Sequence, residues 1–550
     1  ITEVDLLRGP MAEDNATSTT LVSDARTGNV TITASANTFA SNDVGRLIRL
    51  HDGFAKISSY TSATSVDADV QENADGRTEL MPSYTATTIS AHEGDPSATG
   101  LEHNDRFQDS SGQFVTQGFK VGMKVSVTGF TDSNNNESSA IIVKVTDDTL
   151  LLAPSSDLTD EAAGDSVTIS GDLTASTDWA LGAFSASTGY PSAVAFYEQR
   201  LVFASTTEQP QTLFFSVGGS FEDFAAGTDA DDALTYTLGS NQVNIIRYLQ
   251  AGRVLLVGTS GGEFVVTSSE DAPLSPTNAV VKRQATYGSA DIQPVQVANV
   301  TLFVQRAKRK LRELVFDLNT DSYQAPDMTI LAEHITDGGI KEMSLQQEPD
   351  NVVWCVLENG KFVGMTYRRE ENVIAWHEHL IGGGFGSDAF GHVESVATIP
   401  GDLNEDDTYL VVKRTVNGGT KRYIEYFSSF DFGDDVEDAF FVDSGLTYSG
   451  AAATFISGLD HLEGETVSIL ANGAVHPDKV VSSGSVTLDY SATKVHIGLN
   501  YSSTLQTMRI EAGGTEGTAQ GKTKRIHEVV LRLFRTVGVK VGSSETELDR

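Results

Sequence analysis

The chain places its apolar residues in short runs separated by polar turns. The runs contain about four to six residues, are rich in β-branched and aromatic side chains, and are bounded by Gly, Asn, Asp and Ser. Helical periodicity, in which apolar residues recur every three or four positions, is almost absent. This pattern predicts an all-β protein with few helices.

Five strong apolar runs recur in the middle of the chain about every 50 residues, which is a spacing typical of β-propeller blades. Their anchor residues are Leu201, Val254, Leu302, Val353 and Leu410. A polar turn and a second strand-like run follow each anchor, and these second runs begin at Leu213, Gly262, Leu311, Lys361 and Lys421. We therefore expect a β-propeller with blade-like hairpin repeats. A long irregular β-sandwich with accidental spacing is the alternative.

The turns between the paired runs have hairpin chemistry. Gly261-Gly262, Asn359-Gly360 and Asn417-Gly418 supply residues that accept the positive φ of tight turns. Further along, Asn472-Gly473 predicts a type I′ turn. These dipeptides favour antiparallel hairpins over longer crossover connections.

Two β-rich segments precede the repeat, one over residues 20–85 and one over 98–172. In the second, Val121, Met123, Val125 and Val127 alternate with Gly and polar residues, which predicts a half-buried strand. Residues 98–172 are expected to form a small barrel of five or six strands.

A further β unit is predicted over residues 445–515, and the tail from Gly517 to Gly542 is more basic than the rest and ends in strand-like alternation. We expect this tail to pair back with an earlier domain. The predicted division of the chain is an N-terminal platform segment, an inserted small barrel, the propeller domain, a sandwich-like β domain, and a C-terminal return strand and tail. The boundaries are 1–97, 98–172, 173–440, 441–516 and 517–550.

The chain of 550 residues is strongly acidic. Asp and Glu total 75 against 38 Lys and Arg, which gives a net charge of −37. A protein that grips duplex DNA needs a basic surface, so this balance argues against that class. No apolar run approaches the length of a membrane span, and no secretory leader is visible. Ile1 in place of Met suggests that the chain begins inside a longer gene product.

The single cysteine, Cys355, lies in the apolar run NVVWCVLE. One cysteine excludes an intrachain disulfide framework and a cysteine-based zinc site. We expect a buried and chemically inert thiol.

Catalytic and metal-binding motifs are weak. Gly258–Gly262 matches G-x-S-x-G, but a second strand follows where a nucleophile elbow needs a helix. Segments starting at Asp317 and Asp402 begin like calcium loops but lack the Gly and Glu of an EF-hand, so a cation held by an irregular loop is the alternative that stays open. His377 and His379 lie on one side of a predicted strand and could chelate a metal, although no third ligand is nearby; a polar strand end packed by Trp376 is the alternative. No metal or cofactor site is therefore predicted.

Two charged clusters stand out. Acidic pairs such as Asp434-Asp435 and Glu437-Asp438 are compatible with a carboxylate dyad for sugar hydrolysis. The spacing of the acidic residues does not identify one pair as that dyad. The densest basic run is either a solvated hairpin tip or a contact with an acidic neighbouring subunit, and it is our predicted subunit interface. This run comprises Arg306, Lys308, Arg309, Lys310 and Arg312.

Several longer segments resemble the tail nozzle proteins of short-tailed bacteriophages, the tail tubular protein B family. The stretch GYPSAVAFYEQRLVFASTTEQPQTLFFSVGGSFEDF, from Gly189, is similar to the opening of the family's nozzle domain. LLVGTSGGEFVV, VIAWHEHLIGGGF, YLVVKRTVNGGTKRYIEYF and GTAQGKTKRIHEVVLRL follow in the same order, and GPMAEDNATSTTL resembles the platform region. The resemblance covers roughly residues 8–541.

The resemblance implies a structural virion protein without enzymatic activity. It would form a homo-hexameric ring at the distal end of the tail, assembled in the host cytoplasm, and would bind the adaptor or gatekeeper ring and fibres or spikes. Genomic DNA would pass through its lumen during ejection, without a stable lipid partner. Members usually carry more sequence before the platform strands than this chain does, and the role of the module at 98–172 varies.

The alternative function is a carbohydrate-binding or glycan-hydrolysing propeller. A sialidase would repeat S-x-D-x-G-x-x-W boxes, which this sequence lacks, and its three Trp offer few platforms for sugar stacking. For the conduit, net negative charge is physically suitable, because an acidic lumen repels phosphate and does not retain DNA in transit.

Overall fold

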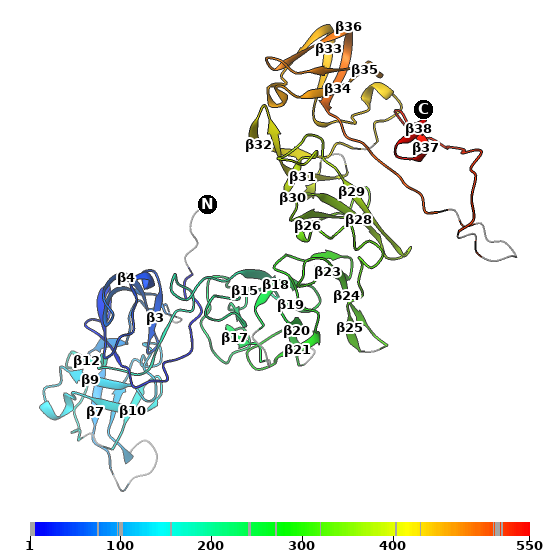
Figure 1. Ribbon diagram of the computed structural model, residues 1–550. Coiled ribbons are helices and arrows are strands. Elements are labelled where there is room, and N and C mark those ends of the chain that lie inside the picture. Colours follow the sequence, from blue (N-terminus) through cyan, green and yellow to red (C-terminus); the bar gives the residue numbers. More distant parts are fainter. Residues whose placement is uncertain are drawn as a thin grey trace. The chain divides into compact units, whose positions relative to one another are not determined.

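The computed structural model consists of β-strands joined by turns and short 3-10 helices (Figure 1). It describes residues 6–73, 76–95, 97, 103–154, 157–239, 244–269, 272–319, 321–401, 404–429, 431–509, 511, 518 and 521–549. No described residue lies in an α-helix, and no described helix has the length and apolar composition to cross a bilayer. The predicted all-β class is confirmed. The chain divides into two compact units, Ile1–Gly288 and Ser289–Arg550, so the predicted propeller region 173–440 extends over both.

The first unit begins with a six-stranded antiparallel sheet. Its core alternates inward apolar residues with outward polar ones, as in β2, where Val30 and Ile32 are buried. Trp179, more than 100 residues later in the chain, returns to the same core. The strands, in sheet order, are β1 (Leu21–Ser23), β2 (Asn29–Ala34), β5 (Ser65–Gln71), β4 (Gly53–Ser62), β3 (Leu47–Leu50) and β13 (Trp179–Leu181).

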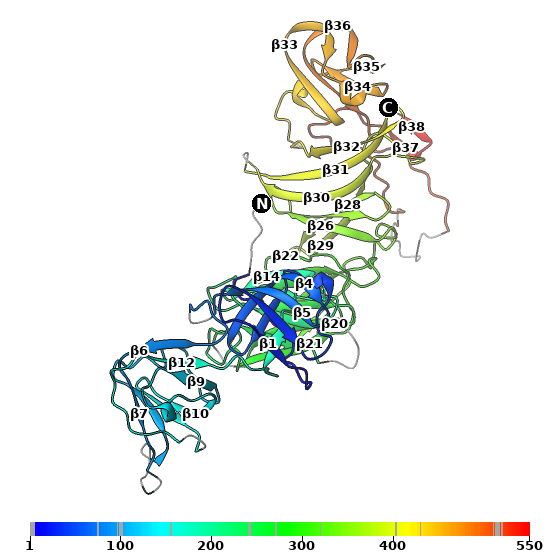
Figure 2. The ribbon, with the colours of Figure 1, turned by 90° about the vertical axis from the view of Figure 1, so that its left-hand side faces the viewer.

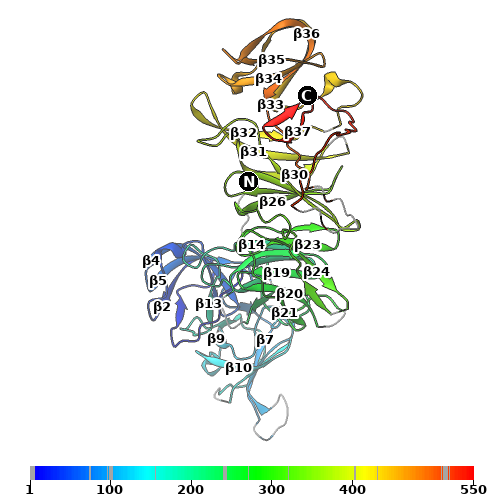
Figure 3. The same ribbon diagram turned by 45° about the vertical axis from the view of Figure 1, so that its right-hand side comes forward.

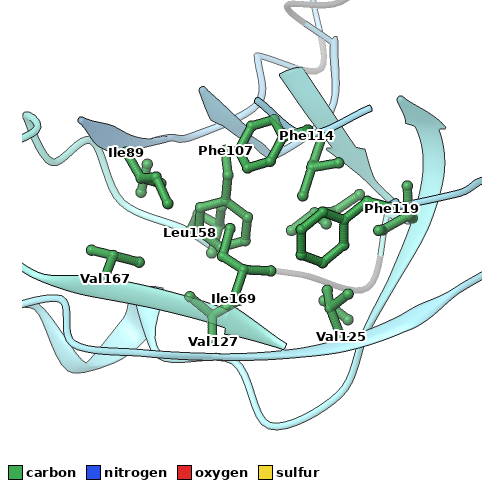
Figure 4. Packing of buried hydrophobic residues seen from close by; sticks show 14 of the residues in the cluster. Ile89, Phe107, Phe114, Phe119, Val125, Val127, Leu158, Val167 and Ile169 are labelled. Atoms are coloured by element: carbon green, nitrogen blue, oxygen red, sulfur yellow. The ribbon is translucent and has the colours of Figure 1, made fainter. Parts of the chain in front are cut away.

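A seven-stranded sheet is inserted between β5 and β13. Its two edge strands are consecutive in the chain, so the sheet curves almost into a barrel around an aromatic core that includes Phe107, Phe114 and Phe119 (Figure 4). The strands, in sheet order, are β6 (Ser83–Ala86), β12 (Val167–Gly171), β9 (Lys124–Thr128), β10 (Ala140–Val145), β11 (Thr149–Leu152), β8 (Arg106–Asp109) and β7 (Ile89–His92).

Two sequence expectations for this module need correction. The sheet begins at Ser83 and not near residue 98, and it has seven strands and not five or six. The strand predicted from Val121 starts only at Lys124, because Gly122 has a φ of 91° and belongs to a turn that leaves Val121 exposed. Val125 and Val127 are buried as predicted.

Two four-stranded antiparallel meanders complete the first unit. Their first strands, β14 and β18, contact each other, and a single apolar core lies between the two sheets. This face-to-face packing of meanders is the arrangement of propeller blades. Blade one contains β14 (Ala193–Tyr197), β15 (Arg200–Ala204), β16 (Thr212–Phe215) and β17 (Leu234–Thr237), and blade two contains β18 (Ile246–Ala251), β19 (Leu255–Thr259), β20 (Gly262–Ser268) and β21 (Ala279–Ala285).

The second unit opens with three more meanders. One apolar core joins blades three and four, and another joins blades four and five. Blade three contains β22 (Val295–Val297), β23 (Val300–Val304), β24 (Leu311–Asp317) and β25 (Ser322–Gln324), and blade four contains β26 (Ile340–Gln346), β27 (Val352–Leu357), β28 (Phe362–Arg368) and β29 (Val373–His379). Blade five has three strands (Figure 2), β30 (His392–Pro400), β31 (Asp406–Val416) and β32 (Gly419–Tyr426).

The five predicted hairpins are confirmed as the second and third strands of the five blades. Their turns differ in detail. Asn417 and Gly418 both have positive φ, as a type I′ turn requires, whereas at the Asn359-Gly360 turn only the glycine does. Neither Gly261 nor Gly262 adopts positive φ, because Gly262 already pairs with Thr259 inside the ladder.

A four-stranded sheet follows blade five, with the type I′ turn predicted at Asn472-Gly473 confirmed between its third and fourth strands in sheet order. In the tail, β37 pairs with β38, the next strand in the chain, and with no other described strand (Figure 1), so the pairing of the tail with an earlier domain stays a prediction. Closing such a short loop costs little chain entropy, which favours local pairing. The strands are β33 (Asp443–Ser457), β36 (Ser485–Leu499), β34 (Thr466–Ala471) and β35 (Ala474–Val480), then β37 (Val541–Ser544) and β38 (Glu547–Asp549).

Candidate functional site

The basic cluster predicted as a subunit interface lies at the tip of the β23–β24 hairpin, and carboxylates of the same chain neutralise much of it. Arg312 donates to Gln305 and to the carbonyl of Ala325, and Arg306 is exposed. The ion pairs join Lys308 to Glu358 (2.6 Å), Lys310 to Asp327 (2.8 Å) and Glu333 (3.5 Å), and Arg309 to Asp337. The acidic partners that we expected from a neighbouring subunit thus come from the same chain. The role of this cluster as a subunit interface remains a prediction.

A groove of about 950 Å³ in the second unit brings together titratable side chains from five segments of the chain. It runs beside β32 and is bounded by the end of β29, the start of β33 and the residues that follow β36. The side chains that determine its chemistry are His377, His379, Glu425, Asp443, His461 and His496. We therefore take this groove as the candidate site.

A buried arginine forms the polar centre beside the groove. Arg414 is fully buried, and its guanidinium binds both carboxylate oxygens of Glu425 while its Nε donates to the carbonyl of Gly382 at 2.7 Å. Gly382 N–H donates in turn to Asp443 Oδ2 at 2.6 Å. Burial raises the pKa of Asp443, although the bond from Gly382 and the nearby Arg414 oppose that shift. The cluster joins blade five to β33.

The glycine-rich run after β29 allows the backbone to close on this arginine. Gly383 has a φ of 86°, and a side-chain Cβ there would lie 2.9 Å from Arg414 Cδ and from Leu499 Cδ1. Only glycine tolerates both the conformation and the approach. Packing around Arg414 and Leu499 therefore explains the glycine at position 383.

The two histidines considered as metal ligands contact each other. His377 Nδ1 lies 2.7 Å from His379 Nε2, and His377 Nε2 lies 3.2 Å from Thr366 Oγ1. Trp354 packs edge-on against both rings. The expectation that Trp376 packs against this strand end is therefore wrong. Trp376 instead donates its indole N–H to a backbone carbonyl. Burial lowers the pKa of both rings, for His379 to about 4, where the neighbouring His377 also contributes.

His496, His461 and Tyr423, which also line the groove, form hydrogen bonds at the joint between the sheets. His496 bonds to Thr447 Oγ1 and to the carbonyl of Glu437, each at 2.9 Å. His461 Nε2 donates to the carbonyl of Ser444, and Tyr423 O–H donates to the carbonyl of His461. The arrangement favours a structural junction over a site in which a base faces a free nucleophile.

The other motifs also have structural roles. Ser260 of the G-x-S-x-G match accepts Ile245 N–H within the β19–β20 hairpin, which confirms the hairpin interpretation. Thr320, in the segment from Asp317, and Asp402 with Leu403 lie outside the described residues. Among the described residues, no group of three or more His, Cys, Asp or Glu side chains could hold a metal ion.

Cys355 occupies the centre of β27 and is fully buried. Burial raises the pKa of its thiol far above the ordinary value, so the reactive thiolate is suppressed. The predicted burial of the cysteine is confirmed.

Sequence reasoning missed the Arg414 cluster. The signal was present, because alternation along β31 places Arg414 on the same face as the buried Leu410, Val412 and Val416. An arginine at an inward position requires a buried acceptor. The acceptor, Glu425, lies on the adjacent strand, but the register of the hairpin pairs Arg414 with Lys421 and Glu425 with Leu410, so the register alone does not identify the acceptor.

Comparison with known proteins gives no family assignment. No protein-family model and no curated protein matches the chain. Similar solved structures include an auxiliary nutrient binding protein from Bacteroides thetaiotaomicron, with 9% identity, TM-score 0.26, and coverage of 74% of this chain and 86% of that chain. The endosialidase of phage phi92 has 9% identity, TM-score 0.20, and coverage of 96% and 80%. Apo AztD from Citrobacter koseri has 11% identity, TM-score 0.20, and coverage of 68% and 96%. At such low scores, these similarities carry no argument about function.

Proposed function

We propose that this protein is a structural component of a short bacteriophage tail, the nozzle at its distal end. The observation that carries the proposal is the series of β-sheets with continuous cores, in which blades three, four and five share their packing faces. Such packing suits a stiff wall, since close-packed interiors transmit strain. The ordered resemblance to tail nozzle proteins supports the same conclusion.

In this proposal six copies form a ring and the genome passes through it during ejection. The net charge of −37 supports a lumen that does not retain DNA. The adaptor ring above and the fibres or spikes beside it are the protein partners. The hydrogen bonds of His461, His496 and Asp443 at the joint between the sheets support a structural role.

Electron microscopy of intact particles labelled with an antibody against this chain tests the proposal. We expect label at the distal end of the tail and six-fold symmetry of the labelled ring. Label on the capsid, or a ring of another symmetry, would contradict the nozzle role. Because an adaptor can template the ring, a monomeric recombinant chain alone does not decide the question.

A hydrolase is the competing class, and it can be tested on the same protein. Glu425 is neutralised by Arg414 and Asp443 is engaged by Gly382, so neither is arranged as a free acid and base pair. We expect no release of reducing sugar from host surface polysaccharide. Release that is lost in Glu425→Gln but not in an exposed control, Glu371→Gln, would favour the hydrolase.

A further inference from the structure

Blade five lacks the outer strand that each of the other four blades has. Its sheet ends at β32, which bonds to β31 on one side, and no strand in the described part of the chain bonds to its other side. An open edge presents unpaired backbone N–H and C=O groups, and native proteins usually cover such edges or protect them with charge.

The end of this edge strand is apolar and exposed. Lys421 and Arg422 protect its first half, but Ile424 is 79% exposed and Tyr426 is 63% exposed. The groove described above runs along the same residues. The second half of β32 therefore has the properties of an unfilled strand-binding site.

A strand-like segment without a strand partner occurs in the same unit. Residues 526–534, sequence IHEVVLRLF, are described but belong to no sheet (Figure 3). Val529, Leu531 and Leu533 alternate along one face, and on the other face Val530 is 83% exposed and Phe534 is 80% exposed. Apolar exposure on this scale is a feature of segments that dock elsewhere.

Ion pairs tether the end of this segment to the residues that follow β32. Arg535, the residue after the segment, pairs with Asp431 and lies 3.0 Å from Asp434, and both acidic residues follow β32 in the chain. Its φ of 46° ends the extended run at Phe534. The charges are complementary over a wider region, since Lys522, Lys524, Arg525 and Arg532 precede Arg535 and acidic residues dominate 431–438. The linker that leads from β36 to this segment starts beside β32, because Tyr501–Thr504 line the groove.

We propose that residues 526–534 of the chain's own tail form the fourth strand of blade five by pairing with the free edge of β32. The tether keeps the segment at high effective concentration, which favours its own chain over a second copy as the source of the strand. Backbone pairing covers Ile424 and Tyr426 and buries one apolar face of the tail segment. The inference does not depend on the proposed function.

Hydrogen exchange on the full chain tests the pairing. We expect amides in 526–534 to exchange at least about tenfold more slowly than those in 503–509, because strand pairing closes them to water. Leu531→Pro removes one backbone donor and should abolish protection in both the tail and β32. Thr507→Pro, in the unpaired linker, is the matched control. Equal exchange in the two segments, or protection of β32 that survives Leu531→Pro, would overturn the proposal.

Cysteine cross-linking identifies the source of the strand. The native Cys355 is buried, so Ile424→Cys can be combined with Val529→Cys, Leu531→Cys or Leu533→Cys and treated with a short bismaleimide. We expect cross-linked chains of monomer mass for at least one pair and none when Val475→Cys replaces Ile424→Cys. Cross-linked dimers would show a strand from a second copy, and no cross-link at any of the three positions would show that β32 stays open; either result contradicts the proposal.

Charge reversal tests the tether. Asp431→Lys with Asp434→Lys should accelerate exchange in 526–534 about tenfold, and adding Arg535→Glu should restore most of the protection. A double substitution without effect would mean that the ion pairs do not guide the strand, and the proposal in this form would be wrong.

Discussion

Blades four and five are neighbours in the second unit, yet they stabilise their sheets in different ways. In blade four the central strands β27 and β28 are almost wholly buried and apolar. In blade five β31 buries only alternate residues, and one of these is Arg414. A sheet covered on both faces can be built from apolar side chains alone, whereas a sheet near the end of a series keeps one polar face and relies on a buried ion pair.

The largest expected effect comes from breaking that ion pair. Arg414→Ala leaves Glu425 without its cation next to the buried Asp443, and we expect a loss of about 3–5 kcal/mol in unfolding free energy. Urea denaturation followed by circular dichroism measures it. The double variant Arg414→Met, Glu425→Leu should lose much less, because no unpaired charge remains. Equal losses would indicate that the charge itself is unimportant.

The histidine pair of blade four predicts a pH dependence. Burial lowers the pKa of His379 to about 4, below its ordinary value, so the unfolded chain binds a proton more readily than the folded chain. Stability should therefore fall as the pH decreases from about 6.5 to about 4, by about 3 kcal/mol from this residue.

Denaturation at a series of pH values measures this dependence. His379→Phe should flatten the curve, because Phe cannot bind a proton and fits the contacts with Trp354 and Phe362. His334→Phe, at an exposed position, is the control and should leave the curve unchanged. An unaltered slope in His379→Phe would assign the pH dependence to other groups.

A smaller effect is expected where blades three and four meet. Tyr367 on β28 donates its hydroxyl to Glu313 Oε2 on β24 at 2.7 Å, and Glu313 is buried. Tyr367→Phe should cost about 1.5–3 kcal/mol, because it removes a hydrogen bond to a charged group. Thermal or urea unfolding measures the cost. A negligible loss would mean that Arg369, 3.0 Å from Glu313, satisfies that carboxylate alone.

The smallest expected signal is the reactivity of Cys355. Its burial and raised pKa predict no labelling of the native chain by a maleimide over hours, and complete labelling in denaturant. Thr420→Cys, on the exposed part of β32, should label within minutes. Rapid labelling of Cys355 in the native chain would mean that blade four opens locally.

The sequence was sufficient for the repeating hairpins, because their signal is local. Anchors such as Val353 lie in runs whose apolar content and turns specify both strands of a pair. The outer and inner strands of each blade were less visible. β22 and β25, for example, have only three residues each, and these are half-buried or exposed, so their position depends on pairing with a neighbour and not on their own composition.

The candidate site depended on contacts that no sequence spacing encodes. Arg414 and Glu425 belong to one hairpin, but Gly382 and Asp443 reach them from segments on either side. The ring that packs on His377 and His379 is Trp354, two strands away, and not the adjacent Trp376. Residues that are close in sequence were therefore not the ones in contact, because folding brings the true partners from other strands.

The inserted seven-stranded module has an evolutionary consequence. Its entry and exit strands pair with each other, and Gly171 N–H donates to the carbonyl of Pro82 at 2.8 Å. The two points where the module joins its host sheet are therefore adjacent, so a single tight turn could replace everything between them. Recombination can therefore exchange or discard such a cassette without redesign of the surrounding strands.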